Sequence, residues 1–254
     1  MRRALALLLM AIPLTACGGD VTSIDPVAQA ASKTENVAGA HFMMNARITV
    51  GGQTVEFSGP GEIADHGKKM HMRMTMPAAI LGMKGLAAKN VTFEAISSGK
   101  QFYFRGGPFG QLAGKKWVAM SDDDPSVNLG QNDPSKMLEY LRAVSKVEEK
   151  GSETVRGVQT THYEARIQLD KVADKASPDA AKTLEQISTG LGTEEIPIEI
   201  WVSDDDLVRK LTMDWHGRQG SFVSDLEMFG FGNVDITVPS ASQTVNLKQL
   251  LGGG

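Results

Sequence analysis

Cys17 is the only cysteine among the 254 residues, and its thiol is the most reactive side chain in the sequence. It directly follows Leu14, Thr15 and Ala16, which end an uncharged apolar stretch that begins at residue 4, after the basic pair at positions 2 and 3. A basic start, a short apolar run and small residues make a secretory signal, and this run is too short to span a bilayer. We therefore expect residues 1–16 to be a signal peptide, removed to leave Cys17 as the first residue.

The segment from Leu14 to Cys17 resembles the bacterial lipobox. In that motif the cysteine sulfur takes a diacylglyceryl group, and the peptide is cut just before the cysteine. The resemblance implies lipid attachment at Cys17, so that no thiol would remain for a disulfide, a metal or a nucleophile. An ordinary signal peptide with a chance cysteine is the alternative. Two acyl chains hold a protein firmly on a membrane, so we expect an exported protein, lipid-anchored on the outer face of the cell membrane.

The remaining polar side chains show no pattern typical of catalysis. None of the histidines has metal-ligand spacing; they are His41, His66, His71, His162 and His216. The acidic triplets 122–124 and 204–206 lack the continuation of a calcium loop and are typical of solvated turns. Ser97 and Ser98 precede a glycine without forming a nucleophile elbow. The sequence predicts no enzyme, no catalytic residue, no metal and no cofactor.

An unusual strand carries a methionine at every second position from Met70 to Met76. In a strand these four side chains share one face, with His71, Arg73 and Thr75 on the other. Methionine adapts to varied apolar shapes, which favours a ligand cavity, whereas simple packing in a filled core is the alternative. The candidate lining residues are Met70, Met72, Met74, Met76, Phe42, Met44, Phe102 and Phe104.

The connection from Pro77 to Ala88 is apolar and longer than a hairpin requires. One interpretation is a mobile flap at the mouth of a pocket, because exposed apolar surface marks contact with ligand or membrane. A short helix buried on the sheet is the other. The candidate flap residues are Ile80, Leu81, Met83 and Leu86.

Hydrophobic periodicity predicts an α+β fold in which antiparallel strands dominate. About ten strands are expected, over residues 42–50, 53–65, 69–76, 91–97, 101–105, 155–169, 196–203, 207–216, 221–228 and 234–238. Gly51 and Gly52 predict a hairpin turn. A bend is expected at 59–61 and a flexible loop at 106–110. Helices are expected over 26–36, 133–144 and, in two parts, 170–189.

Composition and charge place the chain among globular proteins. Hydrophobic residues make up 41%, charged residues 22%, and the net charge is −4. Cleavage would remove Arg2 and Arg3 and make the charge two units more negative, which argues against nucleic acid as a partner. We expect a polar tether over residues 17–25 and a single lipid-binding domain over 26–254.

Three segments of the sequence resemble those of a known protein family. They are Ala40-His41-Phe42, the segment 151–163 (GSETVRGVQTTHY) and the segment 198–211 (IEIWVSDDDLVRKL). Together with the lipobox, they resemble the LppX/LprG family of actinobacterial envelope lipoproteins, over roughly residues 26 to 240. The resemblance implies a LolA-like fold, in which a strongly curved antiparallel sheet forms a half-open barrel with helices on its concave face. It also implies an apolar cavity for the acyl chains of lipids or lipoglycans, and no catalytic residues.

The expected function is that of a lipid carrier or chaperone in the cell envelope. Its expected partners are the membrane, reached through Cys17, an acylated lipid or glycolipid as ligand, and a membrane transporter. Two alternatives keep the fold but fill the cavity. One is an interaction or assembly module, and the other is a sensor of the state of the envelope.

Overall fold

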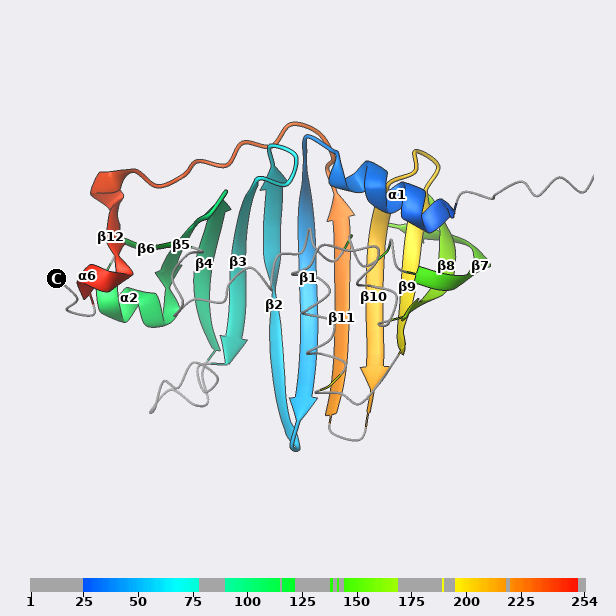
Figure 1. Cartoon of the computed structure of the whole chain (residues 1–254), viewed down its shortest axis with the longest axis horizontal. Coiled ribbons are helices and arrows are strands. Elements are labelled where there is room, and N and C mark those ends of the chain that lie inside the picture. The colour runs from blue at the N-terminus through cyan, green and yellow to red at the C-terminus, as the bar shows by residue number, and fades with distance from the viewer. Residues whose placement is uncertain are drawn as a thin grey trace, which may run out of the picture.

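The computed structural model describes residues 25–77, 90–114, 116–121, 138, 141, 144–168, 189, 195–217 and 220–250, and its main feature is one large sheet (Figure 1). The strands are β1 (Gly39–Val50), β2 (Gln53–Ala64), β3 (Lys69–Pro77), β4 (Asn90–Ser98), β5 (Gln101–Gly106), β6 (Trp117–Ser121), β7 (Val144–Val155), β8 (Val158–Gln168), β9 (Glu195–Ser203), β10 (Val208–His216), β11 (Gly220–Phe229) and β12 (Thr244–Asn246). The helical elements are α1 (Pro26–Glu35), α2 (Gly107–Ala113), the 3-10 turn η4 (Ala241–Gln243) and α6 (Leu247–Leu250).

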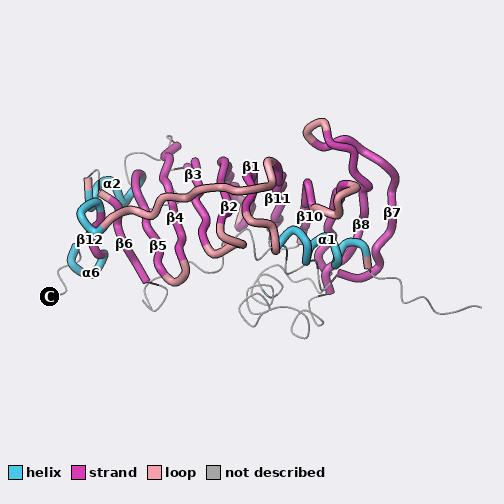
Figure 2. Tube along the Cα trace, turned by 90° about the horizontal axis from the view of Figure 1, so that it is seen from above, coloured by secondary structure: helices cyan, strands magenta, loops and turns pink. Residues whose placement is uncertain are grey.

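The sheet has twelve strands and is open and curved, in the order β12-β6-β5-β4-β3-β2-β1-β11-β10-β9-β8-β7 (Figures 1 and 2). Neighbouring strands are antiparallel, except for β12 and β6, which are parallel. Most neighbours follow one another along the chain. The pairing of β1 with β11 joins the two halves of the molecule at the centre of the sheet.

Two glycine turns decide the length of the strands around them. Gly51 and Gly52 have φ angles of 59° and 79°, so the predicted hairpin between β1 and β2 is confirmed. Arg156 and Gly157 have φ angles of 49° and 80° and join β7 to β8 in the same way. The strand predicted over 155–169 is present as β8, but it begins three residues later than predicted, because the prediction overlooked this turn.

The strand prediction has further errors. Twelve strands form instead of about ten, and β6, β7 and β12 were not expected. The segment 234–238 is extended but pairs with no strand. It belongs to a connection that leaves β11 and runs across the strands from β1 to β6 before it reaches β12 (Figures 1 and 2). Ile236 from this connection is buried against Ile96 and Trp117, which holds the connection on the sheet.

The two faces of the sheet differ in character. We call the apolar face the one that carries Phe42 and Met72, and the polar face the one that carries His71 and Glu94. The apolar face forms the main core with α1, in a cluster that includes Val27, Ala30, Ala31, Phe42, Ile63, Met70, Met72, Leu138, Leu141, Ile198, Ile200, Leu211, Leu226 and Met228. Burial of these side chains is the main source of stability.

The predicted first helix is confirmed as α1, and its ends follow from local chemistry. Asp25 Oδ1 accepts hydrogen bonds from the backbone N–H groups of Val27, at 3.0 Å, and Ala28, at 3.4 Å. Pro26 occupies the first helical position, where its missing N–H costs nothing. Small buried side chains on one side of α1 allow it to lie close to the sheet.

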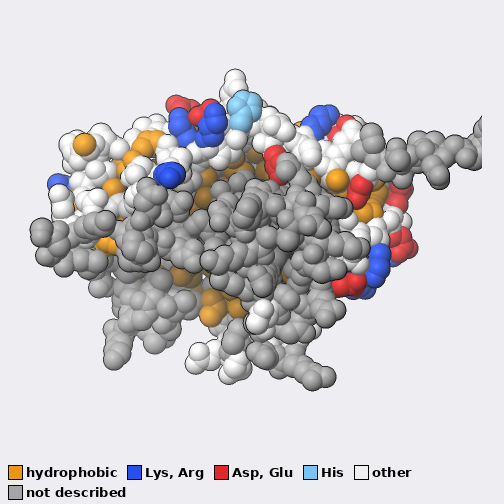
Figure 3. Space-filling model, in the orientation of Figure 1, with side chains coloured by type: hydrophobic (Ala, Val, Ile, Leu, Met, Phe, Trp, Pro, Cys, Tyr) orange, Lys and Arg blue, Asp and Glu red, His pale blue; other side chains and the backbone are white. Residues whose placement is uncertain are grey.

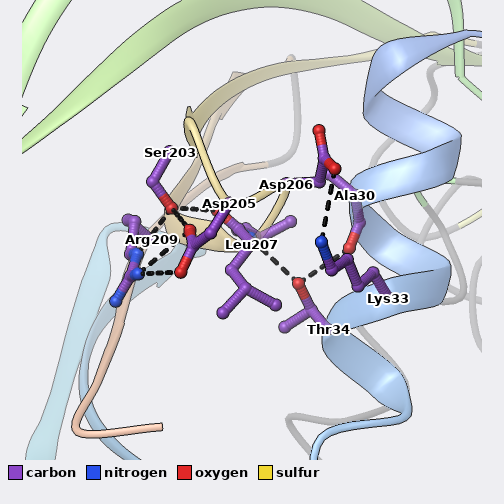
Figure 4. A network of polar contacts seen from close by, with 9 residues as sticks. Ala30, Lys33, Thr34, Ser203, Asp205, Asp206, Leu207 and Arg209 are labelled. Atoms are coloured by element: carbon purple, nitrogen blue, oxygen red, sulfur yellow. Dashed lines mark hydrogen bonds and ion pairs between the residues drawn. The ribbon is translucent and has the colours of Figure 1, made fainter.

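Thr34 fastens α1 to the start of β10 (Figure 4). Its hydroxyl donates to Ala30 O at 2.7 Å and accepts from Val208 N at 2.9 Å, and the side chain is buried. At the surface, Lys33 forms an ion pair with Asp206 at 3.3 Å. The turn between β9 and β10 therefore positions the helix.

Other helix and loop predictions had mixed outcomes. The segment 106–110, expected as a flexible loop, contains the start of α2, whose Pro108 stands in the first turn. At 59–61, where a bend or bulge was expected, β2 keeps the same register with β3 on both sides and forms no bulge, but the pairing with β3 is interrupted at Gly59 and Pro60. The predicted helices over 133–144 and 170–189 lie outside the described residues, apart from Leu138, Leu141, Val144 and one terminal position. Val144 begins β7 instead of continuing a helix.

Candidate functional site

The strand register places all eight predicted lining residues on the apolar face. One row across the sheet contains Phe42, Gly61, Met72, Ala95 and Phe104, each opposite the next. The other five residues lie on the same strands at even spacing from this row, so their side chains project from the same face. They are Met44, Met70, Met74, Met76 and Phe102.

The apolar face continues across the other half of the sheet, which the sequence analysis did not assign to the site. From Met44 one row runs through Leu226, Leu211, Ile200 and Tyr163. A neighbouring row contributes Ile198 and Ala165. The alternation within each predicted strand signalled these apolar positions. What it did not reveal is that β11 lies beside β1, which makes the surface continuous.

Burial on the apolar face changes along the strands. Near α1, Phe42 is 1% exposed, Met228 2% and Met72 6%. Towards the turn between β1 and β2, the apolar side chains of β1 to β4 and of β11 are only half-buried: Ile48, Val55, Phe57, Met76, Val91 and Phe222. At the same end of β10, β9 and β8 the apolar face is buried, with Trp215 5%, Ile196 3% and Ile167 0% exposed. Hydrophobic side chains are visible at the surface in several places, the lower part of the molecule among them (Figure 3). Among the described residues, the face is therefore more accessible at the lower ends of β1 to β4 and β11.

The candidate flap is attached at this accessible end. Pro77, the last residue of β3, lies opposite Asn90, the first residue of β4. The intervening segment, with Ile80, Leu81, Met83 and Leu86, lies outside the described residues. Its two ends flank the half-buried pair Met76 and Val91.

A second apolar cluster covers the face at β5 and β6. Phe104 stacks on Phe109 of α2, with ring centroids 4.9 Å apart. Val118 and Met120 complete the cluster with residues of α6. α2 thus packs on the apolar face at this end of the sheet, as α1 does near β9 and β10.

The polar face carries ion pairs beside the apolar cluster of Ile96, Trp117 and Ile236. Glu94 pairs with Arg73 at 2.9 Å and with Arg105. Burial works to raise the pKa of Glu94, but hydrogen bonds and charge from the two arginines outweigh it, and its pKa lies below the ordinary value. The Arg105 guanidinium also lies 4.4 Å from the centroid of the Trp117 ring.

His162 and Trp201 form a stacked pair on the polar face, with ring centroids 4.4 Å apart. Glu153 accepts a hydrogen bond from Trp201 Nε1 at 2.9 Å and lies 3.0 Å from His162 Nδ1. The hydrogen bond from Trp201 is the main cause that lowers the pKa of Glu153. Burial opposes it, and the nearby His162 lowers the pKa further. Glu199 Oε2 stands 3.0 Å from the other ring nitrogen of His162, off the line of a hydrogen bond. This cluster ties β7, β8 and β9 together.

An open groove of about 540 Å³ lies on the polar side at β7 to β10. Its lining includes Lys146, Glu148, Glu164, Arg166, Glu199, Thr212, Asp214 and His216. Lys146 pairs with Glu195, and His216 pairs with Asp214. A charged groove is unsuited to an acyl chain and is separate from the predicted apolar cavity.

Within the described residues, no three His, Cys, Asp or Glu side chains are grouped so that they could hold a metal ion. In the same ranges, no helix combines the length and the apolar character that crossing a bilayer requires. Cys17 lies outside the described residues.

Comparison by sequence finds one distant relative. The chain matches no protein-family model. It is 30% identical over 149 residues to an uncharacterized 31.2 kDa protein of Streptomyces griseus from the rplA-rplJ intergenic region. The match covers 57% of this chain and 47% of that protein, so the chain spans about half the length of this relative.

Comparison by structure finds solved structures of low identity. LprF from Mycobacterium bovis has a TM-score of 0.49 at 14% identity, and the match covers 85% of this chain and 94% of LprF. The lipoprotein LppX from Mycobacterium tuberculosis has a TM-score of 0.47 at 14% identity, and the match covers 85% of this chain and 100% of LppX. A LolA superfamily protein from Nitrosomonas europaea has a TM-score of 0.30 at 7% identity, and the match covers 82% of this chain and 93% of that protein.

Proposed function

We propose that this protein is a cell-envelope lipoprotein, exported and anchored through Cys17, that binds acyl chains of lipids or glycolipids against the apolar face of its sheet. In this proposal it works as a carrier or chaperone and catalyses no reaction. It presents the lipid to partners in the membrane.

The observation that carries the proposal is the continuous apolar face, with half-buried side chains at the lower ends of β1 to β4 and β11 and buried side chains elsewhere. A surface lined by methionine, leucine and isoleucine takes an acyl chain without polar recognition, because burial of apolar surface is not directional. Half-buried residues such as Met76 and Phe222 would form the entrance. The deeply buried row near Phe42 would form the inner end.

The energy available is sufficient for retention. A sixteen-carbon chain gains on the order of 12 kcal/mol from burial, at about 0.8 kcal/mol per CH₂, before the entropic costs of binding. The four methionines of β3 are unbranched and flexible, so they can adjust to chains of different shape. We therefore expect selectivity for acyl character more than for one chain length.

A second candidate is a protein with the same architecture and a filled core, working in assembly or sensing. The burial of Met70, at 8% exposed, and of Met72, at 6%, favours this alternative, since side chains in a filled core are buried in the same way. The two candidates differ in whether a lipid is part of the native protein.

Native mass spectrometry distinguishes them. The form starting at Gly18 lacks the anchor and keeps every described residue, so it can be purified from the envelope without detergent. We expect an added mass that disappears after organic extraction and returns when a lipid extract is supplied. A protein that carries no added mass and takes up none would contradict the carrier function and support the filled core.

A further inference from the structure

Ser224 is a polar residue in the middle of the apolar face. It lies on β11 opposite Ala46 of β1 and Met213 of β10. Along its own strand, the neighbours on the same face are Phe222 and Leu226. Ser224 is 2% exposed, and its hydroxyl oxygen has no hydrogen-bond partner among the residues that the structure describes.

The other buried polar side chains of the described residues are satisfied at least in part. Thr34 bonds to Ala30 and Val208, Thr160 donates to Glu153 O at 2.8 Å, and Ser203 donates to Leu207 O at 3.1 Å. His162 lies 3.0 Å from a carboxylate oxygen. Ser224 is thus the one of these five whose side chain has no polar partner in the described part of the chain, whereas His162, like His71 and Gln168, has a single buried atom without a hydrogen bond. A buried hydroxyl without a partner is costly, so its presence requires a reason.

The surroundings of Ser224 define what kind of partner would satisfy it. Its four nearest positions on the face are all uncharged, namely Ala46, Met213, Phe222 and Leu226. A hydroxyl donates one hydrogen bond, and a carbonyl oxygen accepts it. An ionised carboxylate would lack a cation here and would pay the cost of burying a charge. A neutral ester or amide carbonyl fits this environment.

We propose that Ser224 donates a hydrogen bond to the ester or amide carbonyl of a bound acyl lipid. The proposal rests on the acyl-binding function above and narrows its ligand class to lipids with an ester- or amide-linked chain, as distinct from ionised free fatty acids. Ser224 lies two residues along β11 from half-buried Phe222, a rise of about 7 Å. The carbonyl is therefore held near the accessible end of the face, and the chain runs inward towards Met228.

The test compares three ligands of similar length: methyl palmitate, heptadecane and palmitate. Each competes with a fluorescent apolar probe for the form starting at Gly18, as wild type and as Ser224→Ala. Ser97→Ala is the matched control, because Ser97 lies on the same face, opposite Met70 and Phe102, and is half-buried. Isotope-edited infrared spectra of methyl palmitate labelled at the carbonyl carbon report the hydrogen bond directly.

We expect Ser224→Ala to weaken the binding of methyl palmitate by about three- to tenfold, which corresponds to the loss of one neutral hydrogen bond. Heptadecane should bind to Ser224→Ala at least as tightly as to the wild type. Ser97→Ala should leave the affinities for methyl palmitate and heptadecane unchanged. The carbonyl band should lie at lower wavenumber in the wild type than in Ser224→Ala.

Two results would overturn the assignment of Ser224 while the acyl-binding function stands. In the first, Ser224→Ala leaves unchanged both the ratio of the affinities for methyl palmitate and heptadecane and the infrared band of the ester carbonyl. The other is palmitate binding that equals or exceeds that of methyl palmitate at neutral pH. A wild type that binds none of the three ligands would overturn the acyl-binding function, and the assignment of Ser224 with it.

Discussion

The ring of Phe42 lies directly over Gly61, so that a Cβ added to Gly61 would stand 2.1 Å from Phe42 Cζ. The two residues are opposite one another on β1 and β2. The glycine makes room for the ring, which in turn forms the inner end of the apolar face at 1% exposure. β2 therefore needs a glycine here for packing and not for a bend.

Gly61→Ala should destabilise the protein by about 1–3 kcal/mol, because the methyl group overpacks the contact with Phe42. Urea unfolding measures the loss. Gly110→Ala is the control, since nothing lies within 4 Å of its added Cβ and helix α2 gains from alanine. Adding Phe42→Leu to Gly61→Ala should recover part of the loss. If Gly61→Ala leaves the unfolding midpoint unchanged, the ring of Phe42 can shift to accommodate the methyl group at little cost, and the prediction is contradicted.

Thr34→Val should cost about 1–3 kcal/mol and loosen α1, because the Val208 N–H loses its acceptor in a buried place. Hydrogen exchange should accelerate in α1 and at the start of β10. Lys33→Ala removes only the exposed ion pair with Asp206 and should have a much smaller effect. Equal effects of the two variants would mean that the surface pair holds the helix.

Glu94→Gln should lower stability at pH 7 by about 1–2 kcal/mol, since the carboxylate is 17% exposed and bonded to two arginines. In the folded protein the pKa of Glu94 lies below its ordinary value of 4.5. Its contribution is therefore complete above about pH 4.5 and is lost as the pH falls through the folded pKa.

The pH series separates this effect from a general loss of packing. Unfolding free energies of wild type and Glu94→Gln should converge as the pH is lowered below 4.5. Glu56→Gln, at the exposed pair with Arg47, serves as the control and should differ little from wild type throughout. A gap between Glu94→Gln and wild type that stays constant to pH 3 would contradict the prediction.

Met72→Trp tests whether β3 lines a lipid site. Met72 stands between Gly61 and Ala95, and a tryptophan there would occupy the space of an acyl chain. We expect bound lipid to fall while the melting temperature of the lipid-free protein stays the same. Met43→Trp, on the polar face, should leave lipid binding unchanged. A loss of about 1–3 kcal/mol of stability in a parent protein without lipid would indicate a filled core instead.

Cys17→Ser tests the anchor. Without the thiol no acyl group can be attached, so the protein should stay uncleaved or leave the membrane fraction. Detergent phase partitioning measures the change, and wild type should enter the detergent phase. Wild type in the aqueous phase, with a thiol at Cys17 that reacts with a maleimide, would contradict the anchor.

Local sequence patterns were sufficient to predict several local features of this protein. Pro26 after Asp25 defined the start of α1, and the glycine pair at 51 and 52 defined the first hairpin, because these signals act through neighbouring residues. Alternation in β3 defined which methionines share a face. It did not define what that face meets.

Strand β7 shows why prediction failed at the edge of the sheet. Residues 144–155 are mostly charged and polar, because the strand has a partner on one side only and is exposed along much of its length. Such a strand has little apolar alternation to detect. Its turn at Arg156 and Gly157 was the one local signal present.

Which strands are neighbours depends on contacts between distant parts of the chain and became known from the fold. β1 pairs with β11 across more than 170 residues of chain, and the connection after β11 crosses the sheet to pair β12 with β6. No local pattern specifies a partner so distant, since many alternating strands could pair equally well. The apolar face exists only after those pairings form. So does the position of Ser224 beside Ala46 and Met213, where a hydroxyl that is ordinary in sequence becomes a buried donor without a partner.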